Sequence, residues 1–165
     1  MTRVAARRRW GDDPRRALAA AARYVRSGVR STSEVLRYLQ RRGLPPVAAA
    51  RVVSGYCTRG LLDDRACARL WADHWARRGY AWAAIRVKLS AKGLANEAIA
   101  AAAGELDAPE DDMARARQIV AAHTSSHAGA RVRMARTLSA RGFDADLIER
   151  LLNESSSPPI FDAER

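Results

Sequence analysis

Apolar residues recur at helical spacing through most of the chain. Leu36 and Leu39 lie three residues apart, and Ile85 and Leu89 lie four apart. Positions three or four apart share one face of an α-helix, so such pairs predict helices with one buried side. Alternation of period two among β-branched residues, which marks strands, is absent, so the chain is predicted to be all-α. Further helical pairs are Ala49 with Val53, Ile99 with Ala103, Ala135 with Leu138, and Ile148 with Leu152.

Proline, glycine and capping residues divide the chain into pieces of helical length. Asp13 before Pro14 predicts one helix start, and Ser31 with Glu34 predicts a capping box at the next. A third helix is expected to begin at Pro45–Pro46, after a glycine has ended the second. Three helices per repeat and nine in all are predicted. Later starts are expected at Asp63 or Asp64, with that helix running to about Arg77, after Gly79–Ala81, and after Leu94–Asn96.

A segment of about fifty residues is repeated three times along the chain. Its anchor is a leucine, then a glycine four residues later, then an apolar residue, and it recurs after 50 and then 49 residues. Self-similarity of this kind predicts an array of small supersecondary units, each burying its apolar face partly against its neighbour. We therefore expect an elongated array of three-helix repeats. The anchors are Leu39, Gly43 and Leu44; Leu89, Gly93 and Leu94; and Leu138, Gly142 and Phe143, and acidic pairs at Asp12–Asp13, Asp63–Asp64 and Asp111–Asp112 keep the same period.

The repeats suggest a division of the chain into five parts. A basic extension over 1–13 precedes three-helix repeats at 14–60, 61–107 and 108–153, and a tail of polar and proline-rich composition follows at 154–165. Segments of such composition do not contribute to a core, so the tail is expected to be disordered and is excluded from the predicted fold.

Charge is distributed very unevenly among these parts. The chain carries a net charge of +11, and most of the surplus falls in residues 14–60, where ten arginines face the single acid Glu34. These arginines cannot be neutralised by acids of their own repeat. A polyanion or an acidic protein surface is therefore expected to meet this end of the chain first.

The candidate binding residues are cations at helical spacing in this basic repeat, extended to cations of the later repeats. One cation directly precedes each anchor glycine, where it can also stabilise the end of a helix through the helix dipole, and both interpretations stay open. The predicted partner- or nucleic-acid-binding residues are Arg16, Arg23, Arg26, Arg37, Arg41, Arg42, Lys88, Lys92, Arg133 and Arg136.

Other residues that often carry chemistry favour structural interpretations. Trp71 and Trp75 have the spacing of a buried helical pair, although aromatic rings also stack on single-stranded bases. His123 and His127 have the spacing of a helical zinc pair, but a third ligand and an HExxH acid are missing. Cys57 and Cys67 lack metal-ligand spacing and are expected to be reduced thiols. No cofactor, metal or catalytic residue is predicted.

Targeting signals do not stand out in the sequence. No apolar stretch approaches the roughly 20 residues that span a bilayer. The opening MTRVAARRRW is basic but is not followed by an apolar signal region. A cytoplasmic protein without membrane contact is expected.

The most specific stretch of the chain resembles the RecX regulators of the bacterial RecA recombinase. Residues 61–94, LLDDRACARLWADHWARRGYAWAAIRVKLSAKGL, are similar to that family's succession of Leu-Asp-Asp, an aromatic-rich helix, Arg-Gly-Tyr and a closing Lys-Gly-Leu. RSTSEVLRYLQRRGL in the first repeat, and DDMARARQIV with LSARGF in the third, extend the likeness to about residues 14–153. Cys67 stands where the family usually has phenylalanine, and Lys88 where glutamate is common.

The resemblance implies a curved, monomeric array of three tandem three-helix repeats that lies in the helical groove of the RecA filament on DNA. Such proteins are not enzymes. They dampen the recombinase by inhibiting its ATPase and strand exchange or by promoting filament loss, and single-stranded DNA is a further possible contact. Two other classes stay open on the residues: a stand-alone basic DNA-binding protein, and an enzyme, for which a phosphate loop, paired carboxylates and a metal set are missing.

Overall fold

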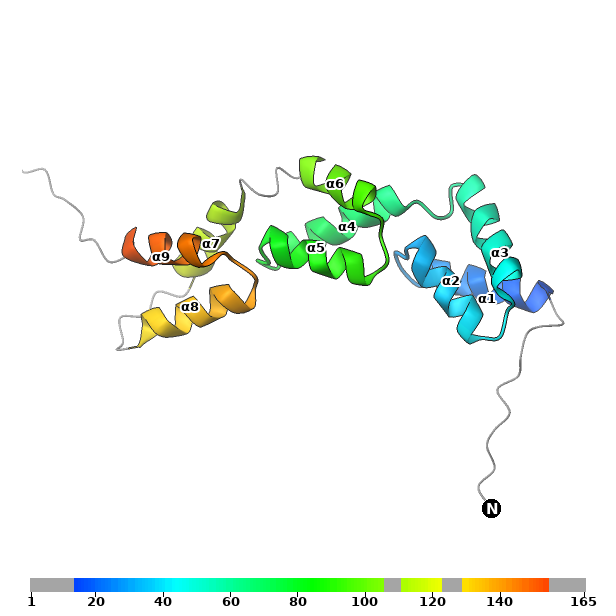
Figure 1. Cartoon of the computed structure of the whole chain (residues 1–165), viewed down its shortest axis with the longest axis horizontal. Coiled ribbons are helices and arrows are strands. Elements are labelled where there is room, and N and C mark those ends of the chain that lie inside the picture. The colour runs from blue at the N-terminus through cyan, green and yellow to red at the C-terminus, as the bar shows by residue number, and fades with distance from the viewer. Residues whose placement is uncertain (1–13, 106–110, 123–128, 155–165) are drawn as a thin grey trace, which may run out of the picture. The chain divides into compact units, whose positions relative to one another are not determined.

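The computed structural model describes residues 14–105, 111–122 and 129–154 (Figure 1). Within these ranges the chain forms nine α-helices and no strand, which confirms the all-α prediction. We refer to α1–α3, α4–α6 and α7–α9 as repeats one, two and three, and the residue boundaries given above for these repeats remain predictions. The helices are α1 (Pro14–Arg26), α2 (Thr32–Arg41), α3 (Pro46–Thr58), α4 (Asp64–Arg77), α5 (Trp82–Ala91), α6 (Asn96–Glu105), α7 (Asp111–Ala121), α8 (Ala130–Ala140) and α9 (Ala145–Glu154).

The helices begin where local sequence chemistry favours a start. Before α2 the capping box is complete: the Glu34 amide donates to Ser31 Oγ at 3.1 Å, and the Ser31 amide donates to Glu34 Oε2 at 3.0 Å. Before α4, Asp63 Oδ1 accepts hydrogen bonds from the amides of Arg65 and Ala66. Helix α1 begins at Pro14 as predicted, while Asp13 lies outside the described residues.

The repeated anchor ends the second helix of every repeat in the same way. In repeat one, Gly43 has a φ of +89° and donates to Gln40 O, while the Leu44 amide donates to Leu39 O. This is a Schellman motif, in which glycine takes the left-handed conformation and a leucine beyond it packs on one inside the helix. The repeat in the sequence is therefore a repeated helix end together with its first core contact. The same pairs of hydrogen bonds occur at Gly93 and Leu94, and at Gly142 and Phe143.

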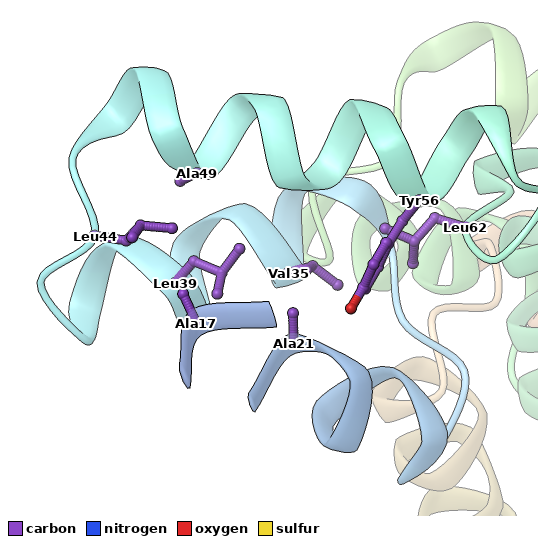
Figure 2. Packing of buried hydrophobic residues seen from close by; sticks show 8 residues of the cluster. All are labelled: Ala17, Ala21, Val35, Leu39, Leu44, Ala49, Tyr56 and Leu62. Atoms are coloured by element: carbon purple, nitrogen blue, oxygen red, sulfur yellow. The ribbon is translucent and has the colours of Figure 1, made fainter. Parts of the chain in front are cut away.

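Repeat one closes around a core drawn from all three of its helices (Figure 2). Val35 and Leu39 of α2 are fully buried between α1 and α3. Ala17 and Ala21 allow α1 to approach closely, because their side chains are small. Tyr56 is buried as well, and its hydroxyl donates to Leu18 O at 3.0 Å. The predicted inward face of the second helix is thus confirmed at Leu39.

Repeat three also has a core, and its buried side chains are mostly larger than the alanines of repeat one. Leu138 of α8 is fully buried and belongs to one cluster with Phe143, Ile148 and Leu152. Ala81, which precedes α5 in repeat two, is buried in the same cluster. The start of α5 is therefore joined to repeat three by apolar packing as well as by the hydrogen bonds described below.

Packing divides the chain into two compact units that do not follow the sequence period. Of the described residues, unit 1 contains 14–71 and 88–102, and unit 2 contains 72–87, 103–105, 111–122 and 129–154. Residues of repeat two contribute to both units. Repetition in sequence records which helices are alike, whereas the units record which residues pack together.

Candidate partner-binding surface and repeat joints

The predicted binding residues lie mostly in the exposed faces of three helices. Arg16, Arg23 and Arg26 are exposed on α1, Arg37 and Arg41 are exposed on α2, and Arg42 is exposed directly after α2. Arg133 and Arg136 are exposed on α8. Lys88 and Lys92, in contrast, are partly buried.

Lys92 is held in an ion pair between repeats. Its Nζ lies 2.8 Å from Glu34 Oε1, and the two side chains are only 14% and 17% exposed. The same ammonium lies 4.1 Å from the centre of the Trp71 ring, a cation–π contact. Lys92 therefore has structural partners on two sides, and we leave it out of the binding surface proposed below. Trp71, expected either in the core or on a base-stacking surface, supports this ion pair.

These neighbours stabilise the ionised form of Glu34. Burial raises its pKa, but the hydrogen bond from Lys92, the Ser31 amide and the positive charges of Lys92 and Arg30 outweigh burial, so that the pKa is lowered from its ordinary value. Because Glu34 is the only acid among residues 14–60, its pairing with Lys92 matters for the whole repeat. The carboxylate that could have offset the arginines of repeat one is already engaged by a cation of repeat two.

Two tyrosines and two arginines form a stack on repeat one. The rings of Tyr24 and Tyr38 lie parallel, with centroids 4.2 Å apart. The Arg30 guanidinium lies 4.6 Å from the Tyr24 centroid, and that of Arg42 lies 5.2 Å from the Tyr38 centroid. These contacts fix two guanidinium groups without neutralising their charge.

A set of contacts that we call joint one connects α2 to the next repeat. The Thr32 amide and hydroxyl donate to the two carboxylate oxygens of Asp64 at 2.8 and 2.7 Å. Ser31 Oγ donates to Lys92 O at 2.6 Å. The start of α2 thus meets the start of α4 and the end of α5, which satisfies orphan groups at helix ends. Joint one consists of Ser31, Thr32, Ser33, Glu34, Asp64, Lys92 and Gly93, and it also includes hydrogen bonds from Ser33 Oγ to Gly93 O and from Arg37 Nη2 to Lys92 O.

An equivalent set, joint two, connects α5 to repeat three. The Trp82 amide donates to Asp112 Oδ1 at 2.9 Å, and the Ala81 amide donates to Arg141 O at 3.0 Å. Arg141 Nη1 donates to Arg78 O at 3.0 Å. Joint two consists of Arg78, Ala81, Trp82, Ala84, Asp112, Arg141 and Gly142, and Gly142 lies close against Ala84.

The cation before the anchor glycine reaches into the preceding repeat in both joints. Lys92 pairs with Glu34, and Arg141 caps the Arg78 carbonyl. Arg42 holds the equivalent place in repeat one, which has no preceding repeat, and lies over Tyr38 instead. From the sequence, these cations were expected to stabilise a helix end through its dipole or to bind a partner. Their role in connecting two repeats was not predicted. The signal was present, because the cation, the glycine and the acidic pair recur with one period.

The described part of the chain offers little for metal or thiol chemistry. No group of three or more potential metal-ligating side chains occurs there, and His123 and His127 lie outside it. Cys67 is buried, and burial with the nearby charge of Asp64 raises the pKa of its thiol to about 11. None of the described helices has the length and apolar character needed to cross a membrane.

Comparison with known proteins identifies the family. The family model described as "RecX, second three-helix domain" matches residues 63–102. The protein "Regulatory protein RecX" of Thermobifida fusca (strain YX) is 30% identical over 145 residues, which cover 84% of this chain and 78% of the relative. The chain belongs to the RecX family. A RecX of Pseudomonas fluorescens is 33% identical over 125 residues, which cover 73% of this chain and 79% of that protein.

Membership confirms the predicted family and the expectation of a non-enzymatic regulatory protein. Solved RecX structures show the same fold. The crystal structure of RecX from Lactobacillus salivarius aligns with a TM-score of 0.72 at 17% identity, over 87% of this chain and 96% of that one. A second, titled "Crystal structure of regulatory protein RecX", aligns with a TM-score of 0.68 at 17% identity, over 85% of this chain and 71% of that one. The prediction of three-helix repeats is thereby confirmed.

Proposed function

We propose that this RecX protein regulates the RecA recombinase, mainly negatively, by binding in the groove of the RecA filament on DNA. Bound there, it inhibits ATP hydrolysis and strand exchange or promotes filament disassembly in recombination and repair. Its curated relatives are named regulatory proteins, which supports a regulatory role for this chain. The protein acts as a cytoplasmic monomer in this proposal.

The observation that carries the proposal is the surplus of exposed positive charge in repeat one. Arg23, Arg26 and Arg41 are exposed, and the one acid of residues 14–60 is paired with Lys92. A protein filament on DNA presents acidic side chains and phosphates along a continuous groove. Positive charge facing such a surface speeds encounter and stabilises the complex.

Later repeats extend the contact in this proposal. Lys88, Arg133 and Arg136 belong to repeats two and three, and the two arginines are exposed. Their repeats carry nearly balanced charge, so we assign them positioning along the groove and assign the main electrostatic attraction to repeat one. Contact with single-stranded DNA is then made through, or beside, the filament.

The same arginines also fit a stand-alone DNA-binding protein. Such a protein would bind bare DNA with an affinity that falls steeply as salt concentration rises, because counterions are released from the phosphates. A filament regulator, by contrast, depends on surface features of RecA that bare DNA lacks. Requirement for the filament therefore separates the two functions.

A pair of charge reversals tests the proposal. Arg23→Glu with Arg41→Glu changes two exposed arginines of repeat one, and Arg86→Glu with Arg150→Glu makes the same change in net charge on exposed arginines elsewhere. We expect the first variant to need an about tenfold higher concentration for half-maximal inhibition of DNA-dependent ATP hydrolysis by RecA, since each lost exposed pair is worth up to about 1 kcal/mol.

The second variant should inhibit at nearly the wild-type concentration. Equal inhibition by both variants and the wild type would remove the repeat-one arginines from the binding surface. Circular dichroism of all three proteins checks that the helices are retained.

A further inference from the structure

Exposed apolar side chains gather in one hollow of unit 1. Val29, Leu61 and Leu70 are 39%, 53% and 50% exposed, although side chains of this size are usually buried. All three line a hollow of about 420 Å³ where the end of α1 and the loop after α3 meet the start of α4. Leu62 and Cys67, which are buried, line the same hollow. A cluster of exposed apolar residues in a concave surface is typical of an interaction site.

The edge of the hollow is positively charged. Arg26, which is exposed, and Arg30 both line it. Arg30 is fixed by the Tyr24 ring and by a hydrogen bond from Nη2 to Ser27 Oγ at 3.3 Å. Its Nε is buried and has no hydrogen-bond partner among the described residues. The acid at this edge, Asp63, already accepts two amide hydrogen bonds at the start of α4.

Unit 2 offers a comparison with a different chemistry. A smaller hollow there is lined by Asp73, Arg77, Asp111 and Arg115 among others. Its charges are paired internally: Arg77 Nε lies 3.0 Å from Asp73 Oδ1, and Arg115 pairs with Asp111 and Asp112. The two hollows therefore differ in character: one is lined by charged side chains that pair with one another, and the other by exposed apolar side chains beside Arg26 and Arg30.

We propose that this hollow is the docking site for a protein surface that presents an apolar side chain beside a carboxylate. The apolar group fills the space between Leu61 and Leu70, and the carboxylate is bound by Arg26 or Arg30. Charge complementarity favours an acidic protein partner, since the hollow belongs to the strongly basic end of the chain. The proposal rests on the proposed function, and its partner is the RecA protein of the filament.

The experiment compares two double variants of the full chain, each of which replaces two exposed apolar side chains. Leu61→Ser with Leu70→Ser alters the hollow, and Val47→Ser with Val87→Ser alters side chains that are 68% and 66% exposed and lie outside it. Affinity for RecA filaments on single-stranded DNA is measured by fluorescence anisotropy with a label at the N-terminus. We expect the Kd of the hollow variant to rise at least tenfold and that of the control variant to change less than twofold.

Salt concentration distinguishes the hollow from the exposed arginines. Apolar contacts are not screened by salt, so the tenfold difference between the hollow variant and the wild type should persist when salt is raised. A third variant, Arg26→Glu, reverses a cation that the edge of the hollow shares with the exposed arginines of repeat one, and it should weaken binding mainly at low salt. Thermal unfolding measured by circular dichroism should be the same for the hollow variant and its control, because the substituted side chains are exposed in both.

Three other outcomes would overturn the proposal. Wild-type binding with an equal Kd for the hollow variant and the control would remove the hollow and leave the proposed function standing. Failure of the wild-type protein to bind filaments would overturn both. Unchanged filament binding, with a change in oligomeric state for the hollow variant alone, would assign the hollow to a second copy of this chain.

Discussion

Joints one and two bring the same backbone positions together with different side chains. In joint one an amide at the start of α2 is bound by Asp64, and in joint two an amide at the start of α5 is bound by Asp112. Around this common element, joint one adds the Lys92–Glu34 ion pair between repeats. Joint two instead adds a guanidinium on a carbonyl, and its Asp112 pairs with Arg115 of its own helix. The constant parts are the glycine helix end and the acidic residue at the start of the next helix. The side chains that accompany them vary.

The comparison separates the contacts that both joints need from those that only one joint has. Orphan amides and carbonyls at helix ends must find partners wherever they are buried, and both joints satisfy them through another helix end. The ion pair of joint one is an addition, which can favour one geometry but costs desolvation of both charges. We therefore expect the glycine position to matter more for stability than the cation beside it.

The largest effect is expected from a methyl group at the anchor glycine. Gly142 has a φ of +84°, and a Cβ there would lie 2.6 Å from Ala84 Cβ and 3.2 Å from Ala84 N. Gly142→Ala should lower the free energy of unfolding by about 3 kcal/mol, because left-handed strain and a clash add together. Urea unfolding followed by tryptophan fluorescence measures the loss.

Two further glycines sharpen this prediction. Gly93→Ala in joint one would place Cβ 2.6 Å from Ser33 Cβ, so a loss similar to that of Gly142→Ala is expected. Gly60 has a φ of +67° with nothing within 4 Å of an added Cβ, and Gly60→Ala should cost only about 1 kcal/mol. Equal losses at Gly60 and Gly142 would mean that the close approach in the joint contributes nothing.

Replacing the cation of each joint should destabilise the protein by a different amount. Lys92→Met leaves the Glu34 carboxylate half-buried without its ion-pair partner, and we expect a loss of about 2–3 kcal/mol. Arg141→Met removes one hydrogen bond to a carbonyl and should cost about 1 kcal/mol. Combining Lys92→Met with Glu34→Gln should recover part of the loss, as urea unfolding would show. A larger effect at Arg141 than at Lys92 would contradict the distinction between the joints.

Acid should weaken joint one through Glu34. Because the folded-state pKa of Glu34 is lowered, its carboxylate adds stability above its ordinary pKa of 4.5, and that contribution is lost as the pH falls through the folded-state value. The difference in unfolding free energy between the wild type and Glu34→Gln should be greatest near neutral pH and should shrink as the pH falls below 4.5. Urea unfolding over this pH range measures it, and a difference independent of pH would contradict the ionised state of Glu34.

The smallest effect concerns the thiols. Cys57 is exposed, and Cys67 is buried beside joint one with a pKa of about 11. We expect a disulfide reagent to modify one thiol in the folded protein and both in urea, because thiolate and access are both required. Cys57→Ser should abolish the reaction of the folded protein. The Gly60→Ala variant leaves the contacts of joint one intact. Rapid reaction of Cys67 in this variant, when it is folded, would contradict the burial of Cys67.

Sequence reasoning located most of the helices because their ends depend on local chemistry. Ser31 and Glu34 cap each other across three residues, and Gly43 with Leu44 ends α2 within one turn. Joint contacts were not predictable in this way. Lys92 and Glu34 are far apart in sequence, and Lys92 could equally have stabilised its own helix end.

The ten candidate binding residues were predicted from charge and helical spacing alone. Charge counting singled out the arginines of repeat one, and exposure in the structure is compatible with that choice without testing it. The hollow at Leu61 and Leu70 could not be found from sequence, since Leu61 lies in a loop and Leu70 has the spacing of an ordinary helical residue. A concave surface depends on how three segments meet, and no local pattern records that.

Co-sedimentation with RecA filaments tests the central claim most directly. The purified protein is spun with RecA on single-stranded DNA and, in parallel, with the same DNA alone at physiological salt. The account predicts that the protein sediments with the filament and stays in the supernatant with bare DNA. Equal sedimentation with both would contradict it and favour a stand-alone DNA-binding protein, and absence from both pellets would contradict filament binding altogether.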